Sequence, residues 1–222
     1  MQGDVRAVTR DLPGDDRQSM RRFISGLVLG AGASSRFGQP KQLLPFRGTT
    51  LLGWVIARAE ESDALDEVIV VLGRAADEIR DRVDFGDTKV VLNSVFGEGC
   101  ASSYRAGIGA LRPESDAIMI ILGDQPGVDP ETINRVAEEW RQRDSLIALA
   151  SYRGRRGHPM IFARPLFDKL AVLHGDKAAW KLVDANPDMV CEVPFDLPFP
   201  EDIDTREDFE RLAAGGEDAR QP

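Results

Sequence analysis

Short apolar runs alternate with amphipathic segments along most of the chain. The apolar runs are rich in Val, Ile and Leu and have the length of buried strands; they occupy residues 23–29, 67–72, 88–92, 116–122, 146–151, 160–163 and 190–193. Between the runs, apolar positions recur at helical spacing, which predicts helices over residues 51–59, 75–83, 130–143, 165–173 and 177–185, one that ends at 111, and one after 205. This alternation predicts a parallel sheet wrapped by helices, with ligands at the carboxyl ends of the strands.

Both ends of the chain lack this periodicity. Residues 1–22 are polar and mix both charge signs, which predicts a disordered extension before the first strand. Residues 213–222 are interpreted as a C-terminal tail. The predicted globular domain therefore spans residues 23–212, and a chain of 222 residues with 42% hydrophobic content can bury a substantial core.

Charge and cysteine usage narrow the class of partner. A formal net charge of −9 argues against nucleic acid or an anionic membrane as the main partner. No apolar run approaches the ~18 residues of a membrane-spanning helix. The two cysteines have no metal-ligand spacing and fit a reducing cytoplasm. In so acidic a chain, a polyphosphate site would have to be locally basic.

The first predicted strand leads directly into a loop of small residues that ends in two cations. Small side chains let backbone N–H groups approach an anion closely. The guanidinium can bind phosphate oxygens in a fork, and the ammonium adds a compact charge. The loop is therefore predicted to bind phosphates through Gly30, Ala31, Gly32, Ala33, Ser34, Ser35, Arg36 and Lys41.

Two better-known glycine motifs do not fit this loop. A P-loop requires Gly-Lys followed by Ser or Thr, whereas here Gln39 and Pro40 separate Gly38 from Lys41. The dinucleotide fingerprint requires a third Gly or Ala where Ser35 stands, and an acidic residue after the next strand, where the chain reads Leu-Gly-Arg. The loop therefore belongs to another class of phosphate site.

A second loop leads into a helix after the predicted strand 88–92. Gly99, Ser102 and Ser103 offer backbone amides and hydroxyls that could hold a base or ribose at the start of the helix. From the residues alone, an ordinary capped helix explains this segment equally well.

A carboxylate follows the predicted strand 116–122. Asp124 lies in a Gly-Asp-Gln-Pro sequence, at the position where a hard cation that bridges phosphates would be held. The alternative is that it caps the next helix. Asp129 suits that role better, because it immediately precedes Pro130 at the first helical position.

A basic segment separates the predicted strands 146–151 and 160–163. Residues 153–159 contain three arginines and two glycines, which predicts a loop suited to an anionic acceptor; a solvated turn is the competing interpretation. Trp180 could stack on a planar acceptor or simply pack in the core. The candidate acceptor-binding residues are Arg155, Arg156 and Trp180, to which the family resemblance described below adds Gly157 and His158.

Four motifs, in order, resemble those of the molybdenum cofactor cytidylyltransferases. Residues 26–41 are similar to the nucleotidyltransferase signature Leu-x-Ala/Gly-Gly-x-x-x-Arg-Met/Phe-Gly-x-x-Lys, and Lys-Gln-Leu-Leu-Pro continues in the style of this branch. Gly99 to Ser103, the Gly-Asp-Gln-Pro sequence and Asp-Ile-Asp-Thr at 202–205 are the others. Two departures are Gly30, where the family usually has Ala, and Trp180, where it often has Arg.

The resemblance implies a fold and a reaction. The fold is a Rossmann-like three-layer αβα sandwich with a mostly parallel, mixed sheet, similar to the nucleotide-diphospho-sugar transferases. The reaction transfers a nucleoside monophosphate, CMP from CTP, to a phosphorylated acceptor, the molybdenum pterin cofactor, with release of pyrophosphate. The implied partners are these small molecules and, in addition, a protein of molybdoenzyme maturation.

The resemblance also assigns roles. Arg36, Lys41 and Asp124 are expected to be catalytic, because they would align and neutralise the phosphates. Mg²⁺ is the expected cofactor, held by Asp124 and Asp204, with Asp202 as the second choice for the latter position. From the residues alone, 202 and 204 could equally belong to a solvated acidic turn.

Three alternatives remain open from the sequence. A nucleotide-binding sensor without catalysis would keep the loop but need not keep both carboxylates. An NAD(P)-dependent oxidoreductase on a similar sheet is disfavoured by the failed dinucleotide fingerprint. A sugar-phosphate or isoprenoid-precursor nucleotidyltransferase shares the first loop, so only acceptor assays separate it.

Overall fold

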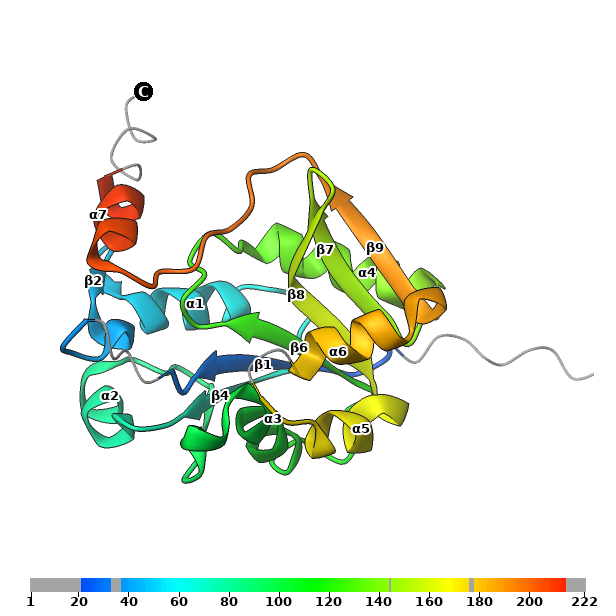
Figure 1. Ribbon diagram of the computed structural model, residues 1–222, viewed down its shortest axis with the longest axis horizontal. Helices are drawn as coiled ribbons and strands as arrows, with labels where there is room; N and C mark the ends of the chain where they lie inside the picture. Colours follow the sequence, from blue (N-terminus) through cyan, green and yellow to red (C-terminus); the bar gives the residue numbers. More distant parts are fainter. Residues whose placement is uncertain (1–20, 33–36, 144, 176–177, 215–222) are drawn as a thin grey trace, which may run out of the picture.

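A seven-stranded sheet forms the centre of the protein (Figure 1). The structure, a computed structural model, describes residues 21–32, 37–143, 145–175 and 178–214. Its strand order is β5-β4-β1-β6-β8-β7-β9. These strands are β1 (Ile24–Gly30), β4 (Glu67–Leu72), β5 (Lys89–Leu92), β6 (Ala117–Leu122), β7 (Ile147–Tyr152), β8 (Arg155–Ala163) and β9 (Val190–Phe195). Only β8 pairs antiparallel to its neighbours, so the sheet is mixed but mostly parallel.

Helices cover both faces of this sheet. They are α1 (Leu51–Glu60), α2 (Ala76–Arg82), α3 (Cys100–Ile108), α4 (Pro130–Arg143), α5 (Phe167–Val172), α6 (Ala178–Ala185) and α7 (Arg206–Ala214). A two-stranded hairpin of β2 (Pro45–Phe46) and β3 (Thr49–Thr50) lies outside the main sheet. Short 3₁₀ helices occupy Lys41–Leu43, Phe96–Glu98, Arg164–Leu166 and Pro187–Met189. The predicted three-layer αβα sandwich is confirmed.

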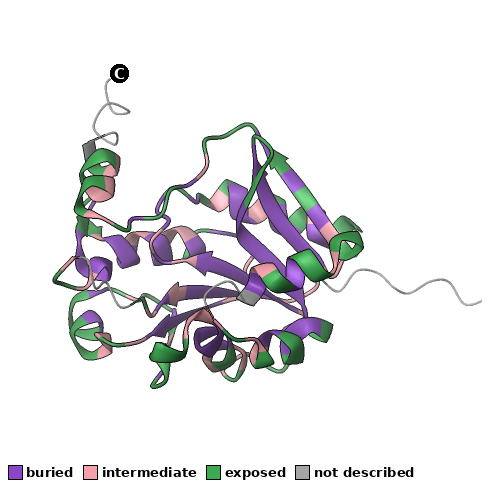
Figure 2. Ribbon diagram, in the orientation of Figure 1, coloured by how far each residue is buried: buried purple, intermediate pink, exposed green. Residues whose placement is uncertain are grey.

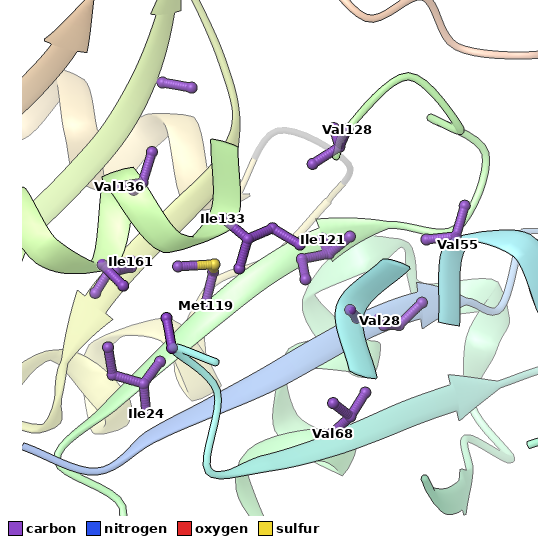
Figure 3. Packing of buried hydrophobic residues seen from close by; sticks show 14 of the residues in the cluster. Ile24, Val28, Val55, Val68, Met119, Ile121, Val128, Ile133, Val136 and Ile161 are labelled. Carbon is purple, nitrogen blue, oxygen red and sulfur yellow. The ribbon is translucent and has the colours of Figure 1, made fainter. Parts of the chain in front are cut away.

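The two faces of the sheet have separate hydrophobic cores. Along β1, Val28 contributes to the core beneath α1 and α4, whereas Leu27 packs in the opposite core with α3, α5 and α6. Successive side chains of a strand point to opposite faces. Figure 3 shows the first core, in which Val55 of α1 and Ile133 of α4 lie over the sheet residues Val28 and Met119. The central strands β1, β4, β6 and β7 are buried on both faces, as the purple ribbon of Figure 2 shows, which explains their continuous apolar sequences.

A third, smaller apolar cluster fixes the C-terminal segment. Ile203 is fully buried beside Leu44, Phe46 and Leu51, and Phe209 of α7 packs against the same cluster. Through these contacts the last part of the domain is fixed beside the segment that follows the first loop. Figure 1 shows α7 beside β2, far from β9, which precedes it in the chain.

The helix caps agree with the sequence. The Thr132 amide donates to Asp129 Oδ1 at 2.7 Å, so Asp129 caps α4 and Asp124 is free of that role. At the start of α7, Asp208 N donates to Thr205 Oγ1 at 3.1 Å and Thr205 N donates to Asp208 Oδ2 at 2.9 Å. This reciprocal pair forms a capping box.

The basic loop predicted at residues 153–159 is wrong in its extent. Arg153 and Gly154 alone form the turn, with φ values of 49° and 84°. Positive φ at both central residues suits the right-handed twist of a tight hairpin. Arg155 and the residues after it already belong to β8, which pairs with β7. Most of the predicted loop is therefore strand, and consecutive side chains such as those of Arg155 and Arg156 point to opposite faces of the sheet.

Among the described residues, no helix is long and apolar enough to cross a membrane.

Gly107 gives a test of how closely α3 packs on the sheet. A Cβ atom at this position would collide with the side chain of the fully buried Leu27. We expect Gly107→Ala to lower the free energy of unfolding by about 1–3 kcal/mol, the usual effect of overpacking a core. Urea denaturation measures it.

Gly109→Ala is the matched control. Gly109 is exposed, has φ −66° and leaves an added Cβ at 3.4 Å or more from its neighbours. It should change stability little, and equal losses in the two variants would contradict the packing argument.

Candidate nucleotide and metal site

A cavity opens at the carboxyl ends of the central strands. In the sheet, β1 lies between β4, which follows it in the chain, and β6, which comes later. The connections from β1 to these strands go to opposite sides of it, so its carboxyl end is a topological switch point. The cavity has a volume of about 810 Å³. Its wall is formed by Leu29, Gly30, Ala31, Gly32, Lys41, Gln42, Arg74, Phe96, Gly97, Gly99, Cys100, Ser103, Leu122, Gly123, Asp124, Asp202 and Asp204.

An ion triad lies in this wall. Lys41 Nζ is 2.6 Å from Asp124 Oδ2 and 3.0 Å from Asp204 Oδ1. Burial on its own would lower the pKa of Lys41, but the Asp124 and then the Asp204 carboxylates outweigh burial and raise the pKa above its ordinary value. Lys41 is therefore charged at neutral pH. The two aspartates, 80 residues apart in sequence, are held together by one ammonium group.

Backbone contacts hold the loop that carries Asp204. The Ile203 amide donates to the Asp124 carbonyl oxygen at 3.0 Å, and the Ile203 carbonyl accepts from Lys41 Nζ at 2.9 Å. Buried Gln125 donates through Nε2 to Asp202 Oδ1 at 2.7 Å and to the Pro200 carbonyl at 3.3 Å. These contacts join the end of β6 to residues 200–204, so the acidic segment is a fixed part of the cavity.

The described wall is not basic, contrary to expectation. Three carboxylates, Asp124, Asp202 and Asp204, accompany two cations, Lys41 and Arg74, among the described lining residues. Burial, and next the neighbouring Asp124, raise the pKa of Asp202, although the Gln125 amide opposes this. A polyphosphate in this cavity would therefore meet repulsion unless a further cation accompanied it.

The residues present fit a divalent cation. Two carboxylate oxygens already surround one positive centre, the Lys41 ammonium, so the pair is arranged to bind a cation. Among the described residues, no cluster of three or more His, Cys, Asp or Glu side chains forms a complete metal cage. Mg²⁺ commonly takes one or two carboxylates and completes its shell with water and substrate phosphates. Asp124 and Asp204 match this incomplete type of site.

A buried polar network supports the second predicted nucleotide-binding loop. Asn93, at the end of β5, donates through Nδ2 to Ser102 Oγ at 2.8 Å and to Ser103 Oγ at 3.2 Å. Ser102 donates its own hydrogen to the Gly99 carbonyl at 2.8 Å. Gly99 and Ser103 line the cavity, whereas Ser102 does not. Ser102 therefore contributes to the shape of the loop, and Ser103 is the serine of this pair that lines the cavity.

Part of the first predicted loop is described. Gly30, Ala31 and Gly32 line the cavity, and Gln42 holds the carbonyls of Gly30 and Gly32 through its Nε2 at 2.8 and 3.0 Å. The remaining predicted members lie outside the described residues: Ala33, Ser34, Ser35 and Arg36.

The predicted acceptor residues are not brought into this cavity. Arg155 lies 3.6 Å above the Phe199 ring and Arg156 forms an ion pair with Glu192 at 2.5 Å, and both arginines are exposed. Gly157 is packed between Tyr152 and Phe199. These residues lie on the first part of β8.

The buried His158 lies beside Trp180, at 6.1 Å between ring centroids in an edge-on arrangement. Trp180 packs against the core with α3, α5 and α6, the structural alternative to ligand stacking.

The comparison with known families assigns the chain to one of them. The model of the MobA-like NTP transferase domain matches residues 26–190, which include the first loop, Lys41 and Asp124. The chain belongs to this family. It is a nucleotidyltransferase of the MobA-like type, with the fold of the nucleotide-diphospho-sugar transferases.

Individual proteins similar to this NTP transferase are named for different activities. Nicotine blue oxidoreductase of Paenarthrobacter nicotinovorans is 33% identical over 202 residues, covering 85% of this chain and 96% of that protein. Molybdenum cofactor cytidylyltransferase of Escherichia coli K12 is 25% identical, covering 82% and 94%. The crystal structure of Rv0371c of Mycobacterium tuberculosis in complex with manganese is 38% identical with a TM-score of 0.76, covering 86% of this chain and 98% of that one.

Sequence reasoning missed the residues that hold the site together. Gln42, Asn93, Gln125 and Ile203 make the contacts that position the loop, the serines and the acidic segment. Ile203 could have been suspected, because it is the one apolar residue between two aspartates. Arg74 also lines the cavity of this NTP transferase, whereas the sequence shows it only as a departure from the dinucleotide fingerprint.

His158 provides a pH test of the region beside the cavity. Burial lowers the pKa of His158 to about 4. An unfolded chain takes up the proton near pH 6.5, whereas the folded chain does not until about pH 4, so stability falls as pH drops through this window. We expect wild type to lose up to about 3 kcal/mol more than His158→Gln between pH 6.5 and 4, measured by urea denaturation. Parallel pH profiles would show that the imidazole is not buried as described.

Proposed function

We propose that the protein transfers a nucleoside monophosphate from an NTP, with CTP as the first choice, to a phosphorylated acceptor, with molybdopterin as the first choice. The observation that carries this proposal is the convergence of Lys41, Asp124 and Asp204 in the wall of a cavity beside the Gly30–Gly32 loop. Membership of the MobA-like family supports the reaction class. The cytidylyltransferase relative and the Lys-Gln-Leu-Leu-Pro sequence support the choice of CTP.

The proposed reaction forms one phosphoanhydride bond and breaks another. An oxygen of the acceptor phosphate attacks the α-phosphorus of the NTP, and the bond from that phosphorus to the bridging oxygen of the β-phosphate breaks. Pyrophosphate leaves with the electron pair. A phosphate monoester is already a nucleophile near neutral pH, so the protein has to align the groups and neutralise charge.

The residues of the cavity would divide these tasks. The backbone amides after β1 would bind the phosphates, together with Ala33, Ser34 and Ser35. Lys41 and Arg36 would contact the triphosphate, and Arg36 would stabilise the charge of the departing pyrophosphate. Asp124 and Asp204 would hold Mg²⁺ or Mn²⁺, which would supply positive charge to the phosphates. Manganese in a structure of the Rv0371c protein supports a divalent cation in this family.

The base and the acceptor would lie on different sides of the phosphates. Gly99 and Ser103, held by Asn93 and with Ser102 supporting the loop, would contact the base or ribose. The acceptor would approach from the β8 side, where Arg155, Arg156, Gly157, His158 and Trp180 are located. The support for this side is that the first part of β8 extends toward the carboxyl end of β6, because Met160 pairs antiparallel with Ile120.

The acceptor assay tests the proposal directly. Purified protein with CTP, Mg²⁺ and molybdopterin should release pyrophosphate, whereas omission of the acceptor should reduce release to background. GTP, ATP and UTP in the same assay establish the donor. Pyrophosphate release with another phosphorylated acceptor but not with molybdopterin would keep the nucleotidyl transfer and remove the pterin.

Loss of either aspartate should reduce turnover. Asp124→Asn and Asp204→Asn are each expected to lower kcat by roughly 10²-fold or more, the scale of losing a contact that stabilises transition-state charge. Asp196→Asn is the control, because Asp196 is 93% exposed and paired with Arg153 outside the cavity. Near-normal turnover in Asp124→Asn at low Mg²⁺ would remove Asp124 from the mechanism.

The oxidoreductase relative favours one second candidate. Nicotine blue oxidoreductase covers 85% of this chain at 33% identity, so a nicotinamide cofactor in the same cavity is the alternative. It predicts that NADH or NADPH raises the melting temperature of the protein more than CTP with Mg²⁺ does. Stabilisation by CTP with Mg²⁺ alone would exclude it.

A further inference from the structure

The hydrogen-bonding capacity of the Lys41 ammonium is fully used inside the protein. Among the described residues, three acceptors surround Nζ: Asp124 Oδ2 at 2.6 Å, the Ile203 carbonyl at 2.9 Å and Asp204 Oδ1 at 3.0 Å. An ammonium group has three N–H bonds and no more. The lysine side chain is 11% exposed, so little of the group faces solvent. In this arrangement Lys41 is a counter-ion of the two aspartates.

Binding a phosphate therefore requires Lys41 to release at least one of these acceptors. Its departure would leave the Asp124 carboxylate, whose side chain is only 25% exposed, next to Asp204 without a compensating charge. An uncompensated, partly buried carboxylate pair is unfavourable. A divalent cation on the same two carboxylates would remove that penalty and would also neutralise phosphate charge.

We propose that Lys41 and a divalent cation occupy the Asp124–Asp204 pair in turn, so that metal binds this pair well only when a nucleotide draws Lys41 away. This inference rests on the metal and nucleotide roles proposed above. Under this proposal Lys41 is not a preformed phosphate ligand. It is the cation that occupies the aspartate pair until a divalent cation replaces it.

The exchange makes metal and nucleotide binding cooperative. Without nucleotide, a metal ion must displace an ammonium that already satisfies both carboxylates, so its affinity is reduced. Reciprocally, bound metal frees Lys41 for phosphate and tightens nucleotide binding by the same factor. Removal of the lysine charge should therefore strengthen the binding of metal alone, although it removes a proposed substrate ligand.

Manganese titration without nucleotide tests the competition. Free Mn²⁺ is measured by electron paramagnetic resonance in the presence of the full-length protein. We expect Lys41→Met to bind Mn²⁺ about tenfold or more tightly than wild type, within the usual range of coupling between sites. Lys41→Arg should stay near wild type, because it keeps the charge.

Two further variants complete the titration. Lys89→Met removes a positive charge on β5, away from the cavity, and should also stay near wild type, which controls for net charge. Thermal melting checks that each variant is folded. Lys41→Gln is the second variant, should Lys41→Met not fold.

A nuclear magnetic resonance titration tests the displacement itself. The chain has five lysines, so ¹³C labelling at lysine Cε gives a spectrum in which the Lys41 signal is assigned by its loss in Lys41→Arg. Saturating Mg²⁺ should move the Lys41 signal and leave the Lys89 signal in place. Mg²⁺ bound without a change at Lys41 would overturn the exchange.

The outcomes separate this inference from the proposed function. If Asp124→Asn and Asp204→Asn bind Mn²⁺ as wild type does, the metal is held elsewhere and the proposed metal site itself fails. If these variants lose Mn²⁺ while Lys41→Met binds it no more tightly than wild type, the metal site stands and the exchange is wrong.

Discussion

The ion triad of Lys41, Asp124 and Asp204 is the interaction on which the site depends. Each member comes from a different part of the chain: the segment after the first loop, the end of β6, and the loop before α7. An ion pair of this kind is costly to break on one side only, because the remaining charge is partly buried. The triad therefore brings together, in one wall, the groups to which the proposed reaction assigns the metal and the phosphates.

The fold produces this convergence through burial rather than through the charges. The carboxyl ends of β1 and β6 are adjacent because the two strands pair in parallel. Residues 200–204 have no regular structure, yet Ile203 is fully buried in the cluster with Leu44, Phe46 and Leu51. That apolar anchor places Asp204 beside Asp124. Full burial of a residue such as Ile203 contributes roughly 2–3 kcal/mol, more than an exposed ion pair does.

The sequence predicts what depends on local pattern. The buried strands, the cap at Asp129 and the carboxylate after β6 all follow from short-range signals, and all three are found. The sequence does not predict the extent of β8. Its glycines and arginines are typical of a loop, but residues from Arg155 onward pair with β7 and are therefore strand. Tertiary context of this kind is not encoded in local propensity.

The sequence also does not predict which polar groups form hydrogen bonds with one another. Nothing local shows that Gln125 holds Asp202, that Asn93 holds two serines, or that the three acceptors of Lys41 include a backbone carbonyl. These contacts join segments far apart in the chain. The wall itself has three carboxylates and two cations among its described residues, which is why the proposed polyphosphate site includes an additional cation.

The central claim is that nucleotide and divalent cation share the cavity of the ion triad. Anomalous X-ray diffraction at the manganese edge, from crystals grown with CTP and Mn²⁺, tests this most directly. The account predicts one anomalous peak bridging Asp124, Asp204 and the nucleotide phosphates, with Lys41 Nζ moved from the carboxylates to a phosphate. A peak at other side chains, or a nucleotide bound outside this cavity, would contradict it.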